Sequence, residues 1–127
     1  MRMHLLRVYL GLVALVLFVS GVAQFMNPQW LSSEGTWSLA QGWQREIAFW
    51  NFSFVTVIII LLQIKDAYVL RVIVVSLVVL TALLGTNHLY SVLTQTVPIW
   101  HHVLVALNYA GAIGGVIVLL IAWRTRA

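Results

Sequence analysis

The stretch LGTNHLYSVLTQTVPIWHHVLVALN, residues 84–108, decides the fold because a short turn separates two apolar runs. Thr96-Val97-Pro98 predicts that turn, since proline cannot donate a helical hydrogen bond. Three of the four histidines, His88, His101 and His102, fall within fifteen residues of one another. The stretch therefore predicts two helices that meet at a turn and bring polar groups to one end of a helical bundle.

The composition of the whole chain excludes a soluble domain. Of its 127 residues, 62% are hydrophobic and 8% are charged, whereas a soluble domain carries about a quarter charged residues. Four apolar runs are long enough to cross a bilayer. We therefore expect an all-α fold, an integral membrane four-helix bundle forming a single domain over residues 1–127, with helices at about 5–26, 45–64, 67–94 and 98–123 and an outer surface loop at 27–44.

The chain has no cysteine and a formal charge of +4. The lack of cysteine excludes disulfides, thiolate metal sites and paired-cysteine redox chemistry. The positive charge does not indicate a nucleic-acid partner, because basic residues at helix ends set the orientation of a membrane protein.

Counting those basic residues predicts the topology. If the four helices alternate in direction, Arg45 is the only cation on one side of the membrane. The excess of cations marks the cytoplasmic side, so both termini are expected in the cytoplasm of a bacterium, with the protein multi-pass in the inner (plasma) membrane. The cations on the cytoplasmic side are Arg2, Arg7, Lys65, Arg71, Arg124 and Arg126.

The first apolar run, Val8–Phe25, has two interpretations. A basic start followed by Gly21-Val22-Ala23 is also typical of a signal peptide and its cleavage site. We interpret it as the first transmembrane helix, ended by Asn27-Pro28. The loop that follows is rich in tryptophan and is expected on the membrane surface, with a helical turn begun by Asn27-Pro28; a tryptophan-lined lid over a ligand is the alternative.

Most polar residues of the expected spans fall in the outer half of the membrane. Two stripes at helical spacing contain several of them: Thr81, Gly85, His88 and Val92 on one helix, and His101, Val105, Asn108, Ala112 and Gly115 on the next. Small residues beside polar ones allow close helix approach and provide hydrogen-bond partners. The candidate polar pocket comprises Glu46, Asn51, His88, His101 and Asn108.

Each of these residues also has a simpler interpretation. Asn51 and Asn108 can serve as interhelical hydrogen bonds, and Gly111-x-x-x-Gly115 as a packing motif or a contact for a homo-oligomer or a membrane partner. His101 and His102 can be solvated at the interface, and they point about 100° apart on a helix. An ionisable group below the headgroups is more specific, so we expect the His88 ring to lie within hydrogen-bond reach of a polar neighbour from the candidate set or across one water.

Metal and haem are alternatives for the histidines. Imidazole and carboxylate groups suit first-row metals, but the chain lacks a histidine pair at i, i+4 on one helix. Haem requires two axial ligands at similar depth on facing helices, and beside His88 only the shallower His101 is available. No metal ligand is therefore assigned and the cofactor is left open.

Two stretches carry a family resemblance. Leu6–Gly11, continuing through Phe18 to Gly21, resembles the opening of DoxX-like proteins, small four-helix bacterial membrane proteins. Gln44–Ile47 with Asn51, Gly85 and His88 is similar to an uncharacterised family of the same size, in which a glycine precedes the histidine where Asn87 stands here. The resemblance implies a four-helix architecture and a region to examine, not an activity. Small multidrug transporters, small fluoride channels and vitamin K reductase-like proteins are set aside for lack of their charged, glycine-rich or cysteine signatures.

The sequence thus leads to a binding or accessory membrane protein. Its outer-half pocket would take an amphipathic ligand, such as a lipid or a quinone, or a membrane-protein partner. Two alternatives stay open. One is a membrane-embedded enzyme that uses His88 and Glu46 as an acid–base pair, and the other is a purely structural subunit of a larger complex.

Overall fold

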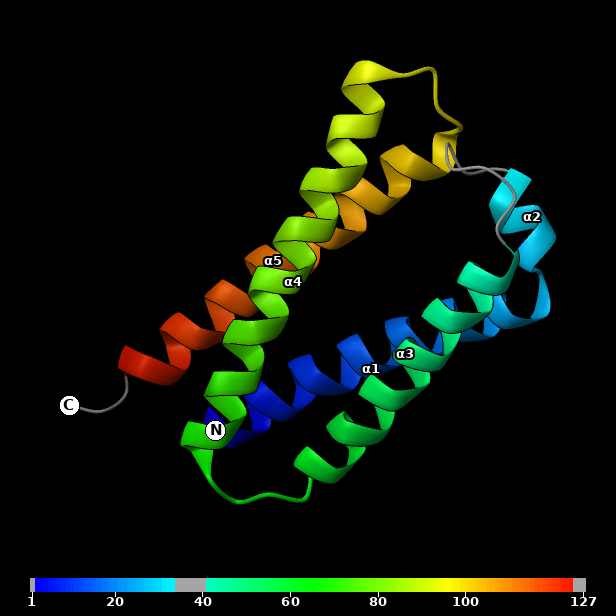
Figure 1. Ribbon diagram of the computed structural model, residues 1–127. Coiled ribbons are helices and arrows are strands. Elements are labelled where there is room, and N and C mark those ends of the chain that lie inside the picture. Colours follow the sequence, from blue (N-terminus) through cyan, green and yellow to red (C-terminus); the bar gives the residue numbers. More distant parts are fainter. Residues whose placement is uncertain (1, 34–40, 125–127) are drawn as a thin grey trace.

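The computed structural model describes residues 2–33 and 41–124, and every regular element in these ranges is a helix (Figure 1). The helices are α1 (Arg2–Met26), α2 (Pro28–Ser33), α3 (Gln41–Leu61), α4 (Ala67–Thr94) and α5 (Ile99–Arg124). Four of them are long and apolar enough to cross a membrane, with mean hydropathies of 2.3 for α1, 1.3 for α3, 2.5 for α4 and 2.3 for α5. The all-helical class expected from the sequence is therefore confirmed, with four helices of the length and apolar character that a membrane span requires.

The third helix begins earlier than expected. α3 starts at Gln41 and ends at Leu61, whereas the sequence pattern suggested 45–64. The first polar turns continue the helix without contributing to its apolar run, which explains both the early start and the lowest hydropathy of the four spans. The expected loop 27–44 contains α2, which starts at Pro28, the position where proline favours a first helical turn. The remainder of that loop, residues 34–40, lies outside the described residues.

The four long helices form two neighbouring pairs. α1 packs along α3, α4 packs along α5, and α1 also contacts α5 and α4 (Figure 1). Phe18 and Phe25 of α1 meet Phe52 and Phe49 of α3, with ring centroids 6.1 Å and 5.8 Å apart respectively. At the opposite ends of the bundle from the chain termini, Trp30 of α2 meets the Trp100 ring edge-on at 5.8 Å, which joins the two pairs.

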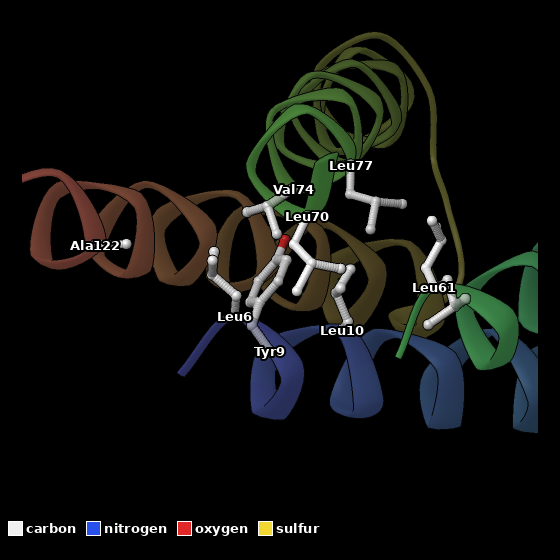
Figure 2. Packing of buried hydrophobic residues seen from close by; sticks show 9 residues of the cluster. Leu6, Tyr9, Leu10, Leu61, Leu70, Val74, Leu77 and Ala122 are labelled. Carbon is white, nitrogen blue, oxygen red and sulfur yellow. The ribbon is translucent and has the colours of Figure 1, made fainter. Parts of the chain in front are cut away.

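The buried apolar core lies towards the end of the bundle that holds the chain termini. It combines the start of α1, the end of α3, the start of α4 and the end of α5 (Figure 2). Its members are Leu6, Tyr9, Leu10, Ile58, Leu61, Leu70, Val74, Leu77 and Ala122. Outside this core the helices expose many large apolar side chains, as expected for surfaces that face lipid.

Two polar contacts lie at the same end of the bundle as the buried core. The side chain of Asp66 accepts a 2.7 Å hydrogen bond from the backbone N–H of Tyr68 and caps α4. The guanidinium of Arg7 donates a 3.0 Å bond to the carbonyl oxygen of Ile64, just beyond α3. The start of α1 and the α3–α4 connection therefore lie on one side of the bundle.

Candidate functional site

The facing surfaces of α4 and α5 are built from the two stripes seen in the sequence. A Cβ atom on Gly85 would lie 3.3 Å from the Cβ of Asn108, and one on Gly111 would lie 3.6 Å from a methyl of Thr81. A Cβ on Gly115 would overlap the side chain of Val78. The small residues therefore allow the two helices to approach closely.

His88 and His101 meet at the end of this interface near the α4–α5 turn. Their Nδ1 atoms lie 3.4 Å apart, within hydrogen-bond distance, and their ring centroids lie 5.3 Å apart at an interplanar angle of 67°. His101 is 6% exposed and His88 is half-buried. The expectation that the His88 ring has a polar neighbour is therefore met, with His101 as that neighbour.

The Nδ1-to-Nδ1 contact has a chemical consequence. One of the two Nδ1 atoms must carry the hydrogen and the other must accept it. In the neutral pair, His88 and His101 are then opposite tautomers, and their Nε2 atoms differ as well: one is an acceptor and the other a donor. The pair can therefore accept a hydrogen bond from a ligand at one ring and donate one at the other.

Asn108 and the residue that follows it support this arrangement. The Asn108 side-chain amide donates a 2.8 Å hydrogen bond to the carbonyl oxygen of Leu104 within α5. Its Cβ packs against Gly85, one turn before His88 on α4. Tyr109 places its hydroxyl 3.1 Å from that of Thr86. Asn108 is therefore part of the same α4–α5 interface, where it positions the helices and bonds to its own helix.

Asn51 and Glu46 lie on a different helix pair. The Asn51 amide donates a 2.8 Å hydrogen bond to the side-chain oxygen of Gln24, and so joins α3 to α1. Glu46 is exposed and lines a shallow hollow on α3 with Phe49, Trp50 and Ser53. The described contacts thus bring His88 and His101 together, with Asn108 nearby, whereas Asn51 bonds to Gln24 and Glu46 lines a separate hollow.

The described residues hold no group of three or more histidine, cysteine, aspartate or glutamate side chains suited to a metal ion. His102, next to His101, is exposed. The candidate site is therefore a two-imidazole site between α4 and α5.

Sequence reasoning missed Gln24, the partner of Asn51. Its only signal was a polar side chain near the end of an otherwise apolar run. In a bilayer such a residue needs a hydrogen-bond partner, and an asparagine on a neighbouring helix would satisfy it.

No protein-family model, curated protein or solved structure matches this chain. What the site does is therefore argued from its residues and their geometry.

Proposed function

We propose that this chain is a small multi-pass inner-membrane protein of the binding or accessory type. Its His88–His101 pair would hold the polar end of an amphipathic ligand, a lipid or a quinone, or a polar group on a membrane partner. The observation that supports this most is the pair itself: two ionisable rings between apolar helices, with their Nδ1 atoms 3.4 Å apart and one ring almost fully buried. Ionisable groups in a membrane span are costly and are functional by default.

The chemistry of the pair fits such a ligand. A quinone carbonyl accepts a hydrogen bond from a ring N–H, and a lipid hydroxyl or amide can use both the donor and the acceptor. Elsewhere on α4 and α5, exposed apolar side chains such as Tyr90, Leu93 and Leu107 offer a surface for a hydrocarbon tail.

The orientation belongs to the same proposal. The contact of Arg7 with Ile64 supports a common side for the N-terminal cations and for Lys65 and Arg71. With those cations in the cytoplasm, the histidine pair lies towards the outer side of the membrane. A DoxX-like relationship is part of the proposal too, and the four-helix arrangement supports it only at the level of general architecture.

The two alternatives draw less support from the contacts. An acid–base pair of His88 and Glu46 requires both groups within reach of one reacting atom, but His88 bonds to His101 and Glu46 lines another hollow. Side chains of this chain already pack against Gly111 and Gly115. A homo-oligomer that used these glycines would have to displace them.

The decisive experiment is native mass spectrometry of the full chain after gentle extraction from the membrane. We expect a bound lipid or quinone mass on the parent protein and its loss in His88→Gln and His88→Leu. The control is His102→Gln, which alters an exposed neighbour and should retain the ligand. Equal adducts on all four proteins, or none on any of them, would reject the proposal.

A further inference from the structure

A cavity of about 310 Å³ lies at the outer end of the bundle, away from the histidine pair's own contacts. It is formed where α1 ends, α2 turns back and α3 begins, on the right-hand side of Figure 1. Its walls are Met26, Asn27, Pro28, Gln29, Trp30, Gln41 and Arg45. The proposed function assigns nothing to this cavity.

The polar lining suits an anion. Arg45 supplies a guanidinium, whose N–H groups match the oxygens of a phosphate, and three side-chain amides supply further donors. No acidic side chain is among the lining residues that the structure describes. The acidic side chains of the described ranges are Glu46, which lines the other hollow, and Asp66, which caps α4. Arg45 is therefore the charged group among the described lining residues, and its guanidinium favours an anion over a cation.

Arg45 is also the exception to the charge asymmetry of the chain. The other six basic residues are assigned to the cytoplasmic side, and an outer cation opposes the orientation that they set. Arg45 lies in the second turn of α3, beyond the first turn where the helix dipole acts most strongly. A bound anion would neutralise the charge of this outer cation.

The remaining walls of the cavity are apolar and lie at the end of the α1 span and beside the start of the α3 span. Met26 closes α1, and the Trp30 ring packs edge-on against Trp100. Trp43, two residues before Arg45 on α3, is 56% exposed. Tryptophan at this level is typical of the headgroup region, where phosphate groups of lipids are also found.

We propose that this cavity binds a phosphate group with net negative charge, and that the group belongs to the headgroup of an anionic phospholipid. Arg45 forms the charged contact, and the amides of Asn27, Gln29 and Gln41 complete the donor set. The glycerol and acyl chains continue along the apolar surface of α1 and α3, where Phe25 and Phe49 are exposed. This site is separate from the histidine pair and stands whether or not that pair binds a ligand.

The test uses the full chain in vesicles made from an equal mixture of phosphatidylcholine and phosphatidylglycerol. Native mass spectrometry after release measures which lipid is retained. We expect phosphatidylglycerol on the parent protein and about a tenfold loss of that preference in Arg45→Gln, as for a lost charge-assisted hydrogen bond. The matched control is Lys65→Gln, the same change of charge on an exposed residue at the opposite end, which should keep the preference.

A second variant and a second probe keep the test decisive. Gln41→Leu retains the charge of Arg45, removes one donor and should lower retention several-fold even if Arg45→Gln does not fold. Inorganic phosphate, titrated onto the protein in pure phosphatidylcholine, tests whether a soluble phosphate binds the cavity in place of a lipid headgroup. If it binds in an Arg45-dependent way and displaces phosphatidylglycerol, the phosphate site stands with a soluble anion as its occupant. Equal retention by the parent, Arg45→Gln and Gln41→Leu proteins, or binding of neither probe, would overturn the proposal.

Discussion

The hydroxyl of Tyr9 donates a hydrogen bond to the backbone carbonyl oxygen of Gly111, with 3.1 Å between the two oxygens. This contact joins α1 to α5 across 102 positions of sequence. Tyr9 is 7% exposed and belongs to the buried core. One turn further along α5, Gly115 leaves room for the same hydroxyl and for Val78 of α4. α1, α4 and α5 therefore pack together at Gly111 and Gly115 of α5.

This junction predicts a graded response to alanine at three glycines. A Cβ on Gly115 would overlap Val78 and lie 2.8 Å from the Tyr9 hydroxyl, one on Gly111 would make ordinary contact with Thr81, and one on Gly114 would meet nothing within 4 Å. We expect Gly115→Ala to destabilise the protein by about 1–3 kcal/mol, the usual cost of overpacking. Gly111→Ala and Gly114→Ala should be nearly neutral, as measured by thermal unfolding in detergent.

Leucine at the same positions extends the series. Gly115→Leu should cost more than Gly115→Ala, and Gly111→Leu should now be destabilising as well, because its side chain extends into Thr81. If Gly115→Leu were as stable as the parent, the close approach of α1, α4 and α5 at this point would be wrong.

A second prediction concerns the amide contact between α1 and α3. The Asn51–Gln24 hydrogen bond lies near Gly21, where a Cβ would be 2.8 Å from the Phe52 ring. A double-mutant cycle with Asn51→Leu and Gln24→Leu should give a coupling of about 0.5–1.5 kcal/mol, the range for interhelical hydrogen bonds in membranes. Unfolding in detergent measures each corner of the cycle. A coupling near zero would mean that the two amides do not bond to each other.

The α4–α5 pair could be predicted from sequence for a simple reason. Two apolar runs joined by a short proline turn must lie side by side, so stripes at helical spacing on each run face one another. Gly85 faces Asn108, and Gly111 faces Thr81. Both contacts follow because positions along the two helices are counted from the same turn. The His88–His101 contact follows from the same count.

Contacts of α3 could not be predicted in this way. The connection from α1 to α3 is long, and the sequence pattern does not set how far α3 slides or rotates against α1. Asn51 was therefore grouped with the histidines by depth alone, although its partner is Gln24 on the first helix. The Arg45 cavity depends in addition on the fold of α2, a six-residue helix with no apolar period to read.

The third prediction concerns orientation in the membrane. Cysteines can be placed singly at Ser33, in α2, and at Thr125, which lies outside the described residues, because the chain has no native cysteine. The excess of cations at the terminal end predicts that an impermeant thiol reagent added to intact cells labels the first and not the second. Permeabilised cells, in which both should react, provide the control. Labelling of the Thr125 position from outside would reverse the orientation and move the histidine pair to the inner side.

The last prediction concerns the hydrogen atom between His88 and His101. Because their Nδ1 atoms face each other at 3.4 Å, one ring must carry its hydrogen on Nδ1 and the other must not. Nitrogen NMR of histidine-labelled protein in a bilayer distinguishes the two ring forms. His4 and His102, both exposed, are removed by His4→Gln and His102→Gln so that only the paired signals remain.

We expect two inequivalent rings on this background, one with a protonated Nδ1 and one with an unprotonated Nδ1. Replacing His101 with phenylalanine, which keeps an aromatic ring at the buried position, should abolish the Nδ1 hydrogen-bond signature of His88. Replacing the exposed Tyr90, also on α4 and 64% exposed, with phenylalanine should leave it unchanged. Two equivalent rings, or a His88 signal that ignores the loss of His101, would show that the imidazoles do not bond, and a ligand could then not use them as a joined donor and acceptor.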